Sequence, residues 1–214
     1  MKGRRLLLAT LLLSFAAAAR KQPPRKRPPP PAVDPARFFA TRPGLIRIYE
    51  GRGDARRAAE NSPPPAGASC EVLESRPRET SAPGSVKESC TMIVARKPRP
   101  ATELSYELRA DGIWNVQVKA QGALAQPVQR LVLPSPLRAG ASWKEPRGAG
   151  RLDRTVRRAG GPCKAAGRSF ADCLVLEVTQ RQGDSVVRRY TETYAAGVGL
   201  VEDAQWELVD IKGL

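Results

Sequence analysis

The residues of this chain that are best suited to chemistry are its cysteines and its carboxylates. The sequence of 214 residues contains 4 cysteines and no histidine. Without histidine, a serine or cysteine nucleophile lacks its usual activating base, and zinc and copper lack their commonest ligand. The sequence therefore predicts no catalytic triad, no metal centre and no cofactor.

The four cysteines favour two disulfides. Their number is even, and none of them forms a Cys-x-x-Cys pair of the kind typical of a zinc site. Sequence alone allows three pairings of four cysteines. Because each neighbouring pair brackets a polar segment that could join two strands, we expect Cys70 to pair with Cys90 and Cys163 with Cys173.

Carboxylates offer the remaining route to hydrolysis. Glu192, Glu202, Asp203 and Asp210 lie near the C-terminal end of the sequence. A glycosidase needs two carboxyl groups about 5–10 Å apart across a cleft. Nothing in the spacing selects such a pair, and acids that alternate with arginine in strands are typical of surface charge pairs. The sequence therefore predicts that the protein is not an enzyme, with carboxylate-dependent hydrolysis as an alternative.

The N-terminal residues have the pattern of an export signal. Three basic residues precede an apolar run over 6–19, and Ala17-Ala18-Ala19 at its end are the small residues that a signal peptidase needs. We expect residues 1–19 to be a signal peptide that is cleaved before Arg20. The apolar run is too short to span a hydrocarbon core about 30 Å thick. The sequence thus predicts a periplasmic or secreted protein with no transmembrane anchor.

A basic, proline-rich linker is expected over residues 20–36. This composition favours an extended spacer, and the whole chain has a formal charge of +15. A basic chain can bind nucleic acid, anionic lipid or acidic glycan, and export makes nucleic acid an unexpected partner. The linker is either a spacer kept soluble by its charge or a contact to an unknown anionic envelope component. The residues that would make this contact are Arg20, Lys21, Arg25, Lys26 and Arg27.

Residues 37–214 have the pattern of a single antiparallel β domain. Short runs of Val, Ile, Leu, Thr and Tyr recur between Gly, Pro and Asp residues. No window has a sustained apolar period of 3.6, so we expect little helix beyond one turn over 55–60. The expected strands are 45–49, 70–75, 86–95, 103–109, 113–119, 127–133, 151–157, 173–181, 186–194 and 200–211.

One hairpin can be given a register from its sequence. The strands 103–109 and 113–119 each have apolar residues at alternate positions. A two-residue loop at Asp111-Gly112 would place the two apolar faces on opposite sides, whereas a three-residue loop from Ala110 to Gly112 places them on the same side. The predicted pairs are Leu108 with Trp114, Tyr106 with Val116 and Leu104 with Val118. The candidate apolar ligand face is Leu104, Tyr106, Trp114 and Val116.

Four motifs follow one another through this domain. They are Phe38-Phe39-x-x-Arg42-Pro43-Gly44, Leu131-x-Leu133-Pro134-x-Pro136-Leu137-x-x-Gly140-x-x-Trp143, Ala166-Gly167-x-x-Phe170-x-x-Cys173-Leu174 and Tyr194-Ala195-Ala196-Gly197-Val198-Gly199-Leu200-Val201. In order and spacing they are similar to those of the TapB-like domains, exported bacterial β-sheet proteins of uncharacterised function. The resemblance implies a single, strongly curved antiparallel sheet, in the form of a half-barrel or clam, and it implies no catalytic residues.

Taken together, these patterns predict a non-catalytic envelope protein with a structural or adaptor-like role. A carrier that holds an apolar or lipid ligand in the curved sheet is the first alternative, and an uncovered concave face lined by apolar residues would favour it. The hydrolase is the second, and a cleft with two facing acids and one raised pKa would favour that. Trp114, Trp143 and Trp206 could stack on sugars, but core positions are the commoner use of tryptophan in sheets.

Overall fold

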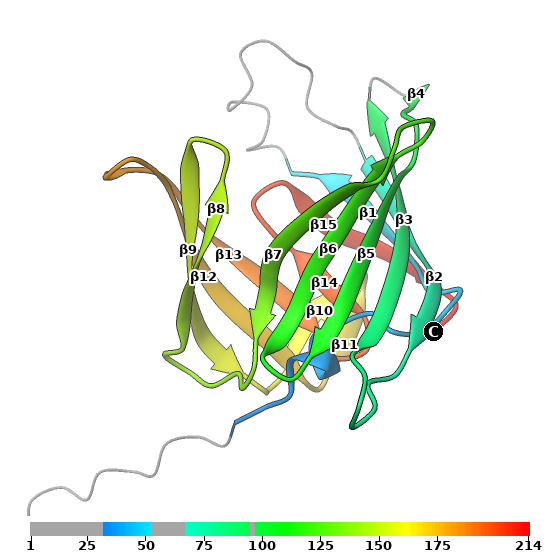
Figure 1. The fold of residues 1–214 in the computed structure, drawn as a ribbon. Helices are drawn as coiled ribbons and strands as arrows, with labels where there is room; N and C mark the ends of the chain where they lie inside the picture. The colour runs from blue at the N-terminus through cyan, green and yellow to red at the C-terminus, as the bar shows by residue number, and fades with distance from the viewer. Residues whose placement is uncertain (1–31, 53–66, 95–96) are drawn as a thin grey trace, which may run out of the picture.

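The computed structural model describes residues 32–52, 67–94 and 97–214. It confirms an all-β fold built on one strongly curved antiparallel sheet (Figure 1). The signal peptide expected at 1–19, the five basic linker residues between 20 and 27, and the helical turn expected at 55–60 lie outside the described residues. Within the described residues, no helix is long and apolar enough to cross a membrane.

The described part of the chain begins with a short 3-10 helix, η1 (Pro35–Phe38), and continues as strands. The strands are β1 (Ile46–Gly51), β2 (Gly67–Arg76), β3 (Gly84–Val94), β4 (Lys97–Pro98), β5 (Thr102–Arg109), β6 (Gly112–Ala120), β7 (Gln126–Pro134), β8 (Ser142–Arg147), β9 (Gly150–Ala159), β10 (Cys163–Ala165), β11 (Arg168–Phe170), β12 (Cys173–Gln182), β13 (Ser185–Ala195), β14 (Gly199–Glu202) and β15 (Trp206–Lys212).

The large sheet curves until its two edges face each other. Its strand order is β7-β6-β5-β3-β2-β1-β15-β14-β13-β12-β9-β8, with β4 paired to β3, and β10 and β11 form a separate hairpin. The edge strands β7 and β8 lie opposite each other across a seam (Figure 1), which an ion pair between Arg130 and Glu145 bridges. The sheet is therefore a nearly closed barrel with one open seam.

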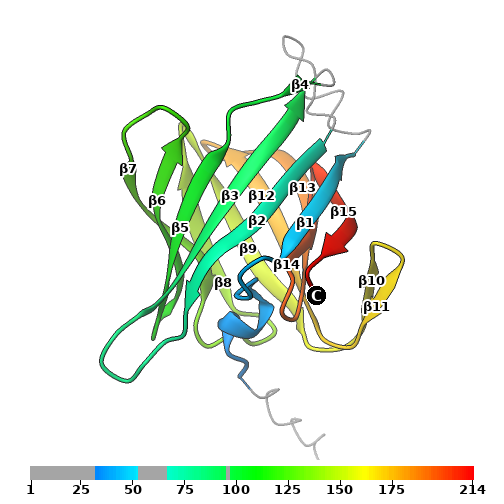
Figure 2. The same cartoon turned by 90° about the vertical axis from the view of Figure 1, so that its right-hand side faces the viewer.

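The two ends of this barrel differ. At one end, which we call the base, η1 and the connections 77–83, 110–111 and 135–141 lie together (Figures 1 and 2). Phe38, Leu45 and Leu137 are fully buried there. The opposite, open end carries the connections 121–125, 148–149, 183–184 and 203–205. The packed core thus fills the base, and the space that remains lies toward the open end.

Alternation along the strands decides which side chains enter the barrel. In β12, Leu174, Leu176 and Val178 are fully buried, as expected for one face of a strand that covers a core. The paired strand β9 buries Leu152 and Val156 in the same way. Arg154, which lies between these two residues on the same face, is also buried. The interior face is therefore apolar near the base but carries charge higher up.

The folded part begins before the end of the linker expected over 20–36. Val33 and Leu137 exchange two backbone hydrogen bonds of 2.8 and 3.0 Å, and Pro35 is buried in η1. The side chain of Asp34 accepts a hydrogen bond from the backbone N–H of Ala36 and so caps this helix. Residues 33–36 therefore belong to the domain, because they tie the base to the β7–β8 connection.

The predicted register of the β5–β6 hairpin is correct far from the turn and wrong near it. Leu104 pairs with Val118 as predicted, but Leu108 pairs with Ile113 and Tyr106 with Asn115. The loop has two residues, 110–111, and a register shift between Ser105 and Tyr106 changes the pairing by one. A β-bulge adds one residue to a strand, so the residues that face inward change by one position from one side of the bulge to the other. Each side still alternates, and the sequence pattern therefore does not reveal where the change occurs.

Two further differences from the expected strands have local causes. The expected strand 200–211 is divided into β14 and β15, because the Oδ1 of Asp203 accepts hydrogen bonds from the backbone N–H groups of Gln205 and Trp206, at 2.6 and 2.8 Å, and turns the chain. Strand β8 was not expected. It contains Pro146 and lies at the edge of the sheet, where proline is tolerated.

Both disulfides have the expected pairing. Cys70 and Cys90 are direct partners on neighbouring strands β2 and β3, and their bond joins them across the sheet. Cys163 and Cys173 link the β10–β11 hairpin to the start of β12. Each bond closes a connection between elements that are near in sequence, so each one staples its own part of the barrel.

Candidate functional site

The interior of the barrel holds two adjoining cavities. A smaller one of about 220 Å³ lies against β1, β2, β3 and β5, and a larger one of about 480 Å³ lies against β7, β8, β9, β12 and β13. We call them the apolar and the polar compartment. They meet at five side chains that line both. These are Leu104, Tyr106, Val132, Tyr194 and Leu200.

Aromatic and aliphatic side chains make up most of the wall of the apolar compartment. Phe39 packs edge-on against Tyr106, with ring centroids 4.8 Å apart. Tyr49 donates a hydrogen bond of 2.8 Å to the carbonyl of Leu200, and burial raises the pKa of its hydroxyl to about 12. Trp206 completes the wall. The hydroxyl of Tyr49 is thus satisfied within the protein, and most of the remaining lining is apolar.

One buried ion pair lies in this apolar wall. Arg47 of β1 donates to Glu88 of β3, and both side chains are almost completely inaccessible to solvent. Burial raises the pKa of Glu88 in spite of the opposing effect of Arg47. Among the described residues, the Nε of Arg47 has no hydrogen-bond partner. A buried donor without a partner is costly.

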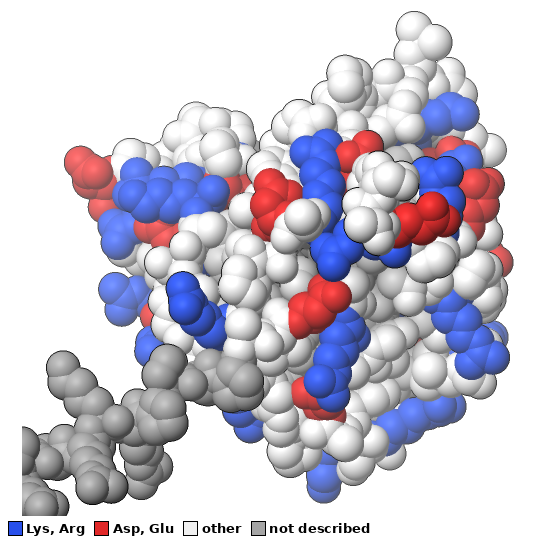
Figure 3. Space-filling model, turned by 60° about the horizontal axis from the view of Figure 1, so that its bottom comes forward, with Lys and Arg blue, Asp and Glu red and all other residues white. Residues whose placement is uncertain are grey.

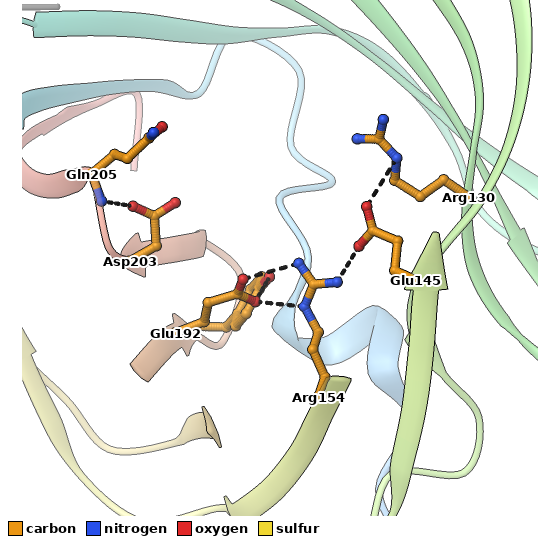
Figure 4. Close-up of polar contacts among 7 residues, drawn as sticks. Arg130, Glu145, Arg154, Glu192, Asp203 and Gln205 are labelled. Atoms are coloured by element: carbon orange, nitrogen blue, oxygen red, sulfur yellow. Dashed lines mark hydrogen bonds and ion pairs between the residues drawn. The ribbon is translucent and has the colours of Figure 1, made fainter. Parts of the chain in front are cut away.

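A network of charged side chains spans the polar compartment (Figure 4). Arg154 donates two hydrogen bonds, of 3.1 and 3.0 Å, to the two carboxylate oxygens of Glu192, and a third hydrogen bond to Glu145. Arg130 reaches the other oxygen of Glu145 from across the seam, at 3.1 Å. The hydroxyl of Tyr194 donates to Glu192 at 3.1 Å. The network therefore ties β7, β8, β9 and β13 together through side chains.

Arg154 is the centre of this network. Burial disfavours its charge, but the two carboxylates and above all Glu192 raise its pKa, so it stays protonated at all physiological pH values. Both carboxylates are more than nine-tenths buried. A buried carboxylate needs a counter-charge, and Arg154 supplies it to both. Arg154 thus holds Glu145 and Glu192 together through its hydrogen bonds.

Asp203 lies in the same compartment and differs from these two carboxylates. Burial, and next the negative charge of Glu192, raise its pKa above the ordinary value, although two backbone N–H groups donate to it. The polar compartment therefore contains an acid that holds its proton more tightly than usual.

Two arginines of the polar compartment are not engaged by its carboxylates. Arg188 donates to the carbonyl of Ala204 at 3.1 Å and lies over the ring of Tyr190, while Arg147 comes from the end of β8 and is exposed. Neither has a carboxylate within ion-pair distance in the described part of the chain. Because the network already neutralises Glu145 and Glu192, these two guanidinium groups make the mouth of the compartment electropositive.

The structure divides the candidate apolar ligand face. Leu104 and Tyr106 line both compartments, as expected, but Trp114 and Val116 line neither. Trp114 pairs with Glu107, one position away from the inward face. It lies under the guanidinium of Arg109 and donates a hydrogen bond of 3.1 Å to Asp111. The β-bulge between positions 115 and 117 moves these two residues off the expected face.

The four candidate carboxylates also separate. Glu192 and Asp203 share the polar compartment. Glu202 instead forms an ion pair with Arg52, and Asp210 accepts a hydrogen bond from the adjacent backbone at Ile211. In the described residues, no group of three or more His, Cys, Asp or Glu side chains could hold a metal ion.

Sequence reasoning missed the residues that organise the site. Glu145 lies on the unexpected strand β8. Arg154 and Glu88 lie on expected strands, but the pattern of apolar residues that predicts those strands does not single out a buried charge within them. A signal was present in β9, where Arg154 occupies the position between Leu152 and Val156 on one face. A charge in such a position is buried, and buried charge requires a partner from another strand.

Comparison with known proteins adds no relative. No family model matches the chain, and neither a curated protein nor a solved structure matches it. The similarity to TapB-like domains therefore stays a prediction, and the function has to be argued from the geometry of the compartments.

Proposed function

We propose that the protein is a carrier that holds an amphipathic molecule inside its barrel, with the apolar part in the apolar compartment and an acidic head in the polar compartment. The observation that supports this most directly is the continuity of the two compartments through Leu104 and Tyr106. Sites for small ligands are typically about 300–1,000 Å³, mostly apolar, with a few polar groups that fix orientation. Together the two compartments, of about 220 and 480 Å³, fall within this range, and they have this division.

The charges support an anionic head. Arg147 and Arg188 lie at the mouth of the polar compartment, and their guanidinium groups suit a carboxylate or a phosphate. Of the carboxylates that line this compartment in the described residues, Asp203 alone lies outside the network, compared with two arginines. An acid therefore fits this mouth better than a cation of the same size.

This proposal includes a location outside the cytoplasm. The two disulfides support it, because such bonds persist in oxidising compartments. A carrier is also consistent with the non-catalytic envelope role that the sequence predicts, and the ligand class proposed for it is an amphipathic acid.

The proposal can be tested with a fluorescent fatty acid, 11-(dansylamino)undecanoic acid, titrated into the purified protein. We expect saturable binding with a blue-shifted emission. Leu104→Trp keeps the wall apolar but fills the junction of the compartments, so it should weaken binding at least about tenfold, a change of about 1.4 kcal/mol. No saturable binding by the wild-type protein, or equal binding by this variant, would contradict the proposal.

The methyl ester of the same probe tests the head. It has the same apolar chain but no charge, and we expect it to bind about 10- to 100-fold more weakly, since a hydrogen bond to a charged group contributes about 1.5–3 kcal/mol. The double variant Arg147→Ala/Arg188→Ala should remove this difference between acid and ester. Arg157→Ala, which changes an exposed arginine on the outside of β9, is the matched control and should preserve it.

A carboxylate-dependent hydrolase is the second candidate, and the raised pKa of Asp203 beside Glu192 is the observation that favours it. The two-fold hydrogen bonding of Glu192 by Arg154 weakens this candidate, because a general base or nucleophile needs a free oxygen. Purified peptidoglycan and p-nitrophenyl esters are suitable test substrates. Product release by the wild-type protein that is lost in Asp203→Asn would support the hydrolase, and release that is the same in both would exclude a role for this acid.

A further inference from the structure

Exposed apolar side chains concentrate at the open end of the barrel. The described residues contain eight large hydrophobic side chains that are exposed, and five of them are at this end. Leu124 is 90% exposed and Val187 57% exposed. The five are Met92, Ile93, Leu124, Val186 and Val187.

The topology places these side chains around the mouth of the cavity. Leu124 lies in the β6–β7 connection, and Val186 and Val187 lie at the start of β13, beside the β12–β13 connection. Met92 and Ile93 lie at the end of β3. Because every neighbouring pair of strands is antiparallel, these positions share one end of the barrel (Figures 1 and 2). The polar compartment reaches the same end through Arg147, Arg188 and the connection 203–205.

Basic side chains accompany the apolar ones. Among the exposed basic residues at this end are Lys97 of β4, Arg99 just after it, Lys119 near the end of β6 and Arg189 near the start of β13. Acidic side chains lie at this end as well. Asp153 is held by Arg151 and Arg181, at 3.0 and 2.8 Å, and Glu103 is held by Lys87, at 3.3 Å. Among the described residues, Glu50, Asp184 and Glu207 are exposed here without an ion pair. Basic and acidic side chains are interspersed at the base as well (Figure 3).

We propose that the open end docks on an anionic lipid membrane, with Leu124, Val186 and Val187 entering the interface and the surrounding lysines and arginines contacting acidic headgroups. This inference rests on the proposed carrier function, since it places the mouth of the cavity against the phase that an amphipathic ligand leaves or enters. Apolar side chains flanked by Lys and Arg are the features that bind an interface and anionic lipid.

The distribution of the apolar residues favours a membrane over a protein partner. Protein interfaces have a contiguous apolar centre with a polar rim. Here the apolar residues stand on separate loop and strand ends, on both sides of a hollow mouth, with charged residues between them. A fluid lipid surface can accept these separate side chains at the same time, whereas a folded protein partner would need a complementary pocket for each one.

Vesicle flotation tests the docking. The purified protein is mixed with vesicles of phosphatidylglycerol and phosphatidylcholine, or of phosphatidylcholine alone. We expect binding to the anionic vesicles. Leu124→Ser/Val187→Ser should reduce the partition coefficient at least about tenfold, because each apolar side chain loses most of its transfer free energy. Leu73→Ser/Leu214→Ser removes two exposed apolar residues away from the open end and is the matched control, which should bind as the wild type does.

The comparison between variants isolates the open end, because all forms share the same basic N-terminal segment. Equal binding by the two double variants, or no binding by the wild type, would overturn the docking. Self-association that is detected by sedimentation and lost only in Leu124→Ser/Val187→Ser would also overturn it, in favour of a second copy as the partner. Titration with the fluorescent fatty acid in the absence of vesicles reports on the carrier function separately, so either proposal can fail without the other.

Discussion

At the scale of single residues, Arg154 is the most consequential side chain in the barrel. It is the counter-charge for two buried carboxylates that come from different strands. A buried ion pair is no guarantee of stability relative to an apolar core, but removing one partner leaves an uncompensated buried charge. The stability of the polar compartment is therefore expected to depend on this one guanidinium group.

Arg154→Met should lower the free energy of unfolding by about 3–5 kcal/mol at pH 7, the usual cost of stranding a buried charge. Arg157→Met, which breaks the exposed pair with Glu177, should cost only about 0–1 kcal/mol. Urea denaturation at pH 7 measures both, and equal losses would contradict the role of the buried network.

Asp203 gives a prediction about pH. Its pKa is higher in the folded protein than the ordinary value, so the folded state holds a proton that the unfolded chain has lost. Stability therefore falls as the pH rises from about 4 through the raised pKa. Asp203→Asn keeps the oxygen that accepts from Gln205 and Trp206 but removes this titration. Thermal melts should show the variant gaining stability over the wild type between pH 4 and 7, and a constant difference would contradict the assignment.

At the scale of elements, the β5–β6 hairpin depends on close approach of a third strand. A Cβ atom added at Gly112 would lie 2.3 Å from the backbone oxygen of Leu133 in β7, and its φ of +145° disfavours other residues. Gly112→Val should therefore cost about 3 kcal/mol or more through overpacking and backbone strain. Asp111→Ala loses the hydrogen bond from Trp114 and should cost about 0.5–1.5 kcal/mol.

Urea denaturation of the two hairpin variants decides this point. The sequence predicts the same order of effects from the turn alone, but the structure adds the contact with β7. Gly112→Ala distinguishes the two causes, since alanine has no branched side chain but still has the Cβ. A cost for Gly112→Ala close to that for valine would support the contact with Leu133, and a negligible cost would contradict it.

The two disulfides staple different pairs of elements, and each should contribute about 2–4 kcal/mol by restricting the unfolded chain. Their sequence separations are 20 and 10 residues, and the entropy of loop closure changes by only about 0.6 kcal/mol for a doubling of length. The variants Cys70→Ala/Cys90→Ala and Cys163→Ala/Cys173→Ala should thus lose similar stability. Denaturation of each variant tests this, and the loss of both bonds should be nearly additive.

The elements were more predictable from sequence than the contacts between them. Alternating apolar residues in 173–181 and 186–194 lead directly to β12 and β13. Strand β8 could not be found in this way, because its proline and charges mask it. The predicted register of β5 and β6 is wrong on one side of a bulge, and the predicted inward orientation of Trp114 is wrong for the same reason. Local pattern specifies strands, whereas bulges depend on neighbouring strands.

At the scale of the whole molecule, closure of the sheet creates a site that no segment contains. Arg130 and Glu145 come from strands at the two edges, and they meet only because the sheet curves through a nearly full turn. Leu104 and Tyr106 could be assigned to the inward face from sequence, since alternation alone decides it. The partners of Arg154 could not, because they depend on which strands face each other across the interior.

The central claim is that the barrel carries an amphipathic ligand, and native mass spectrometry of the protein recovered from the envelope of the producing cells tests it most directly. We predict that the wild-type protein carries an additional mass that is removed by organic solvent, and that Leu104→Trp, with the junction of the compartments filled, is recovered without it. A wild-type protein with the bare polypeptide mass, or an adduct that is retained in the filled variant, would contradict the claim.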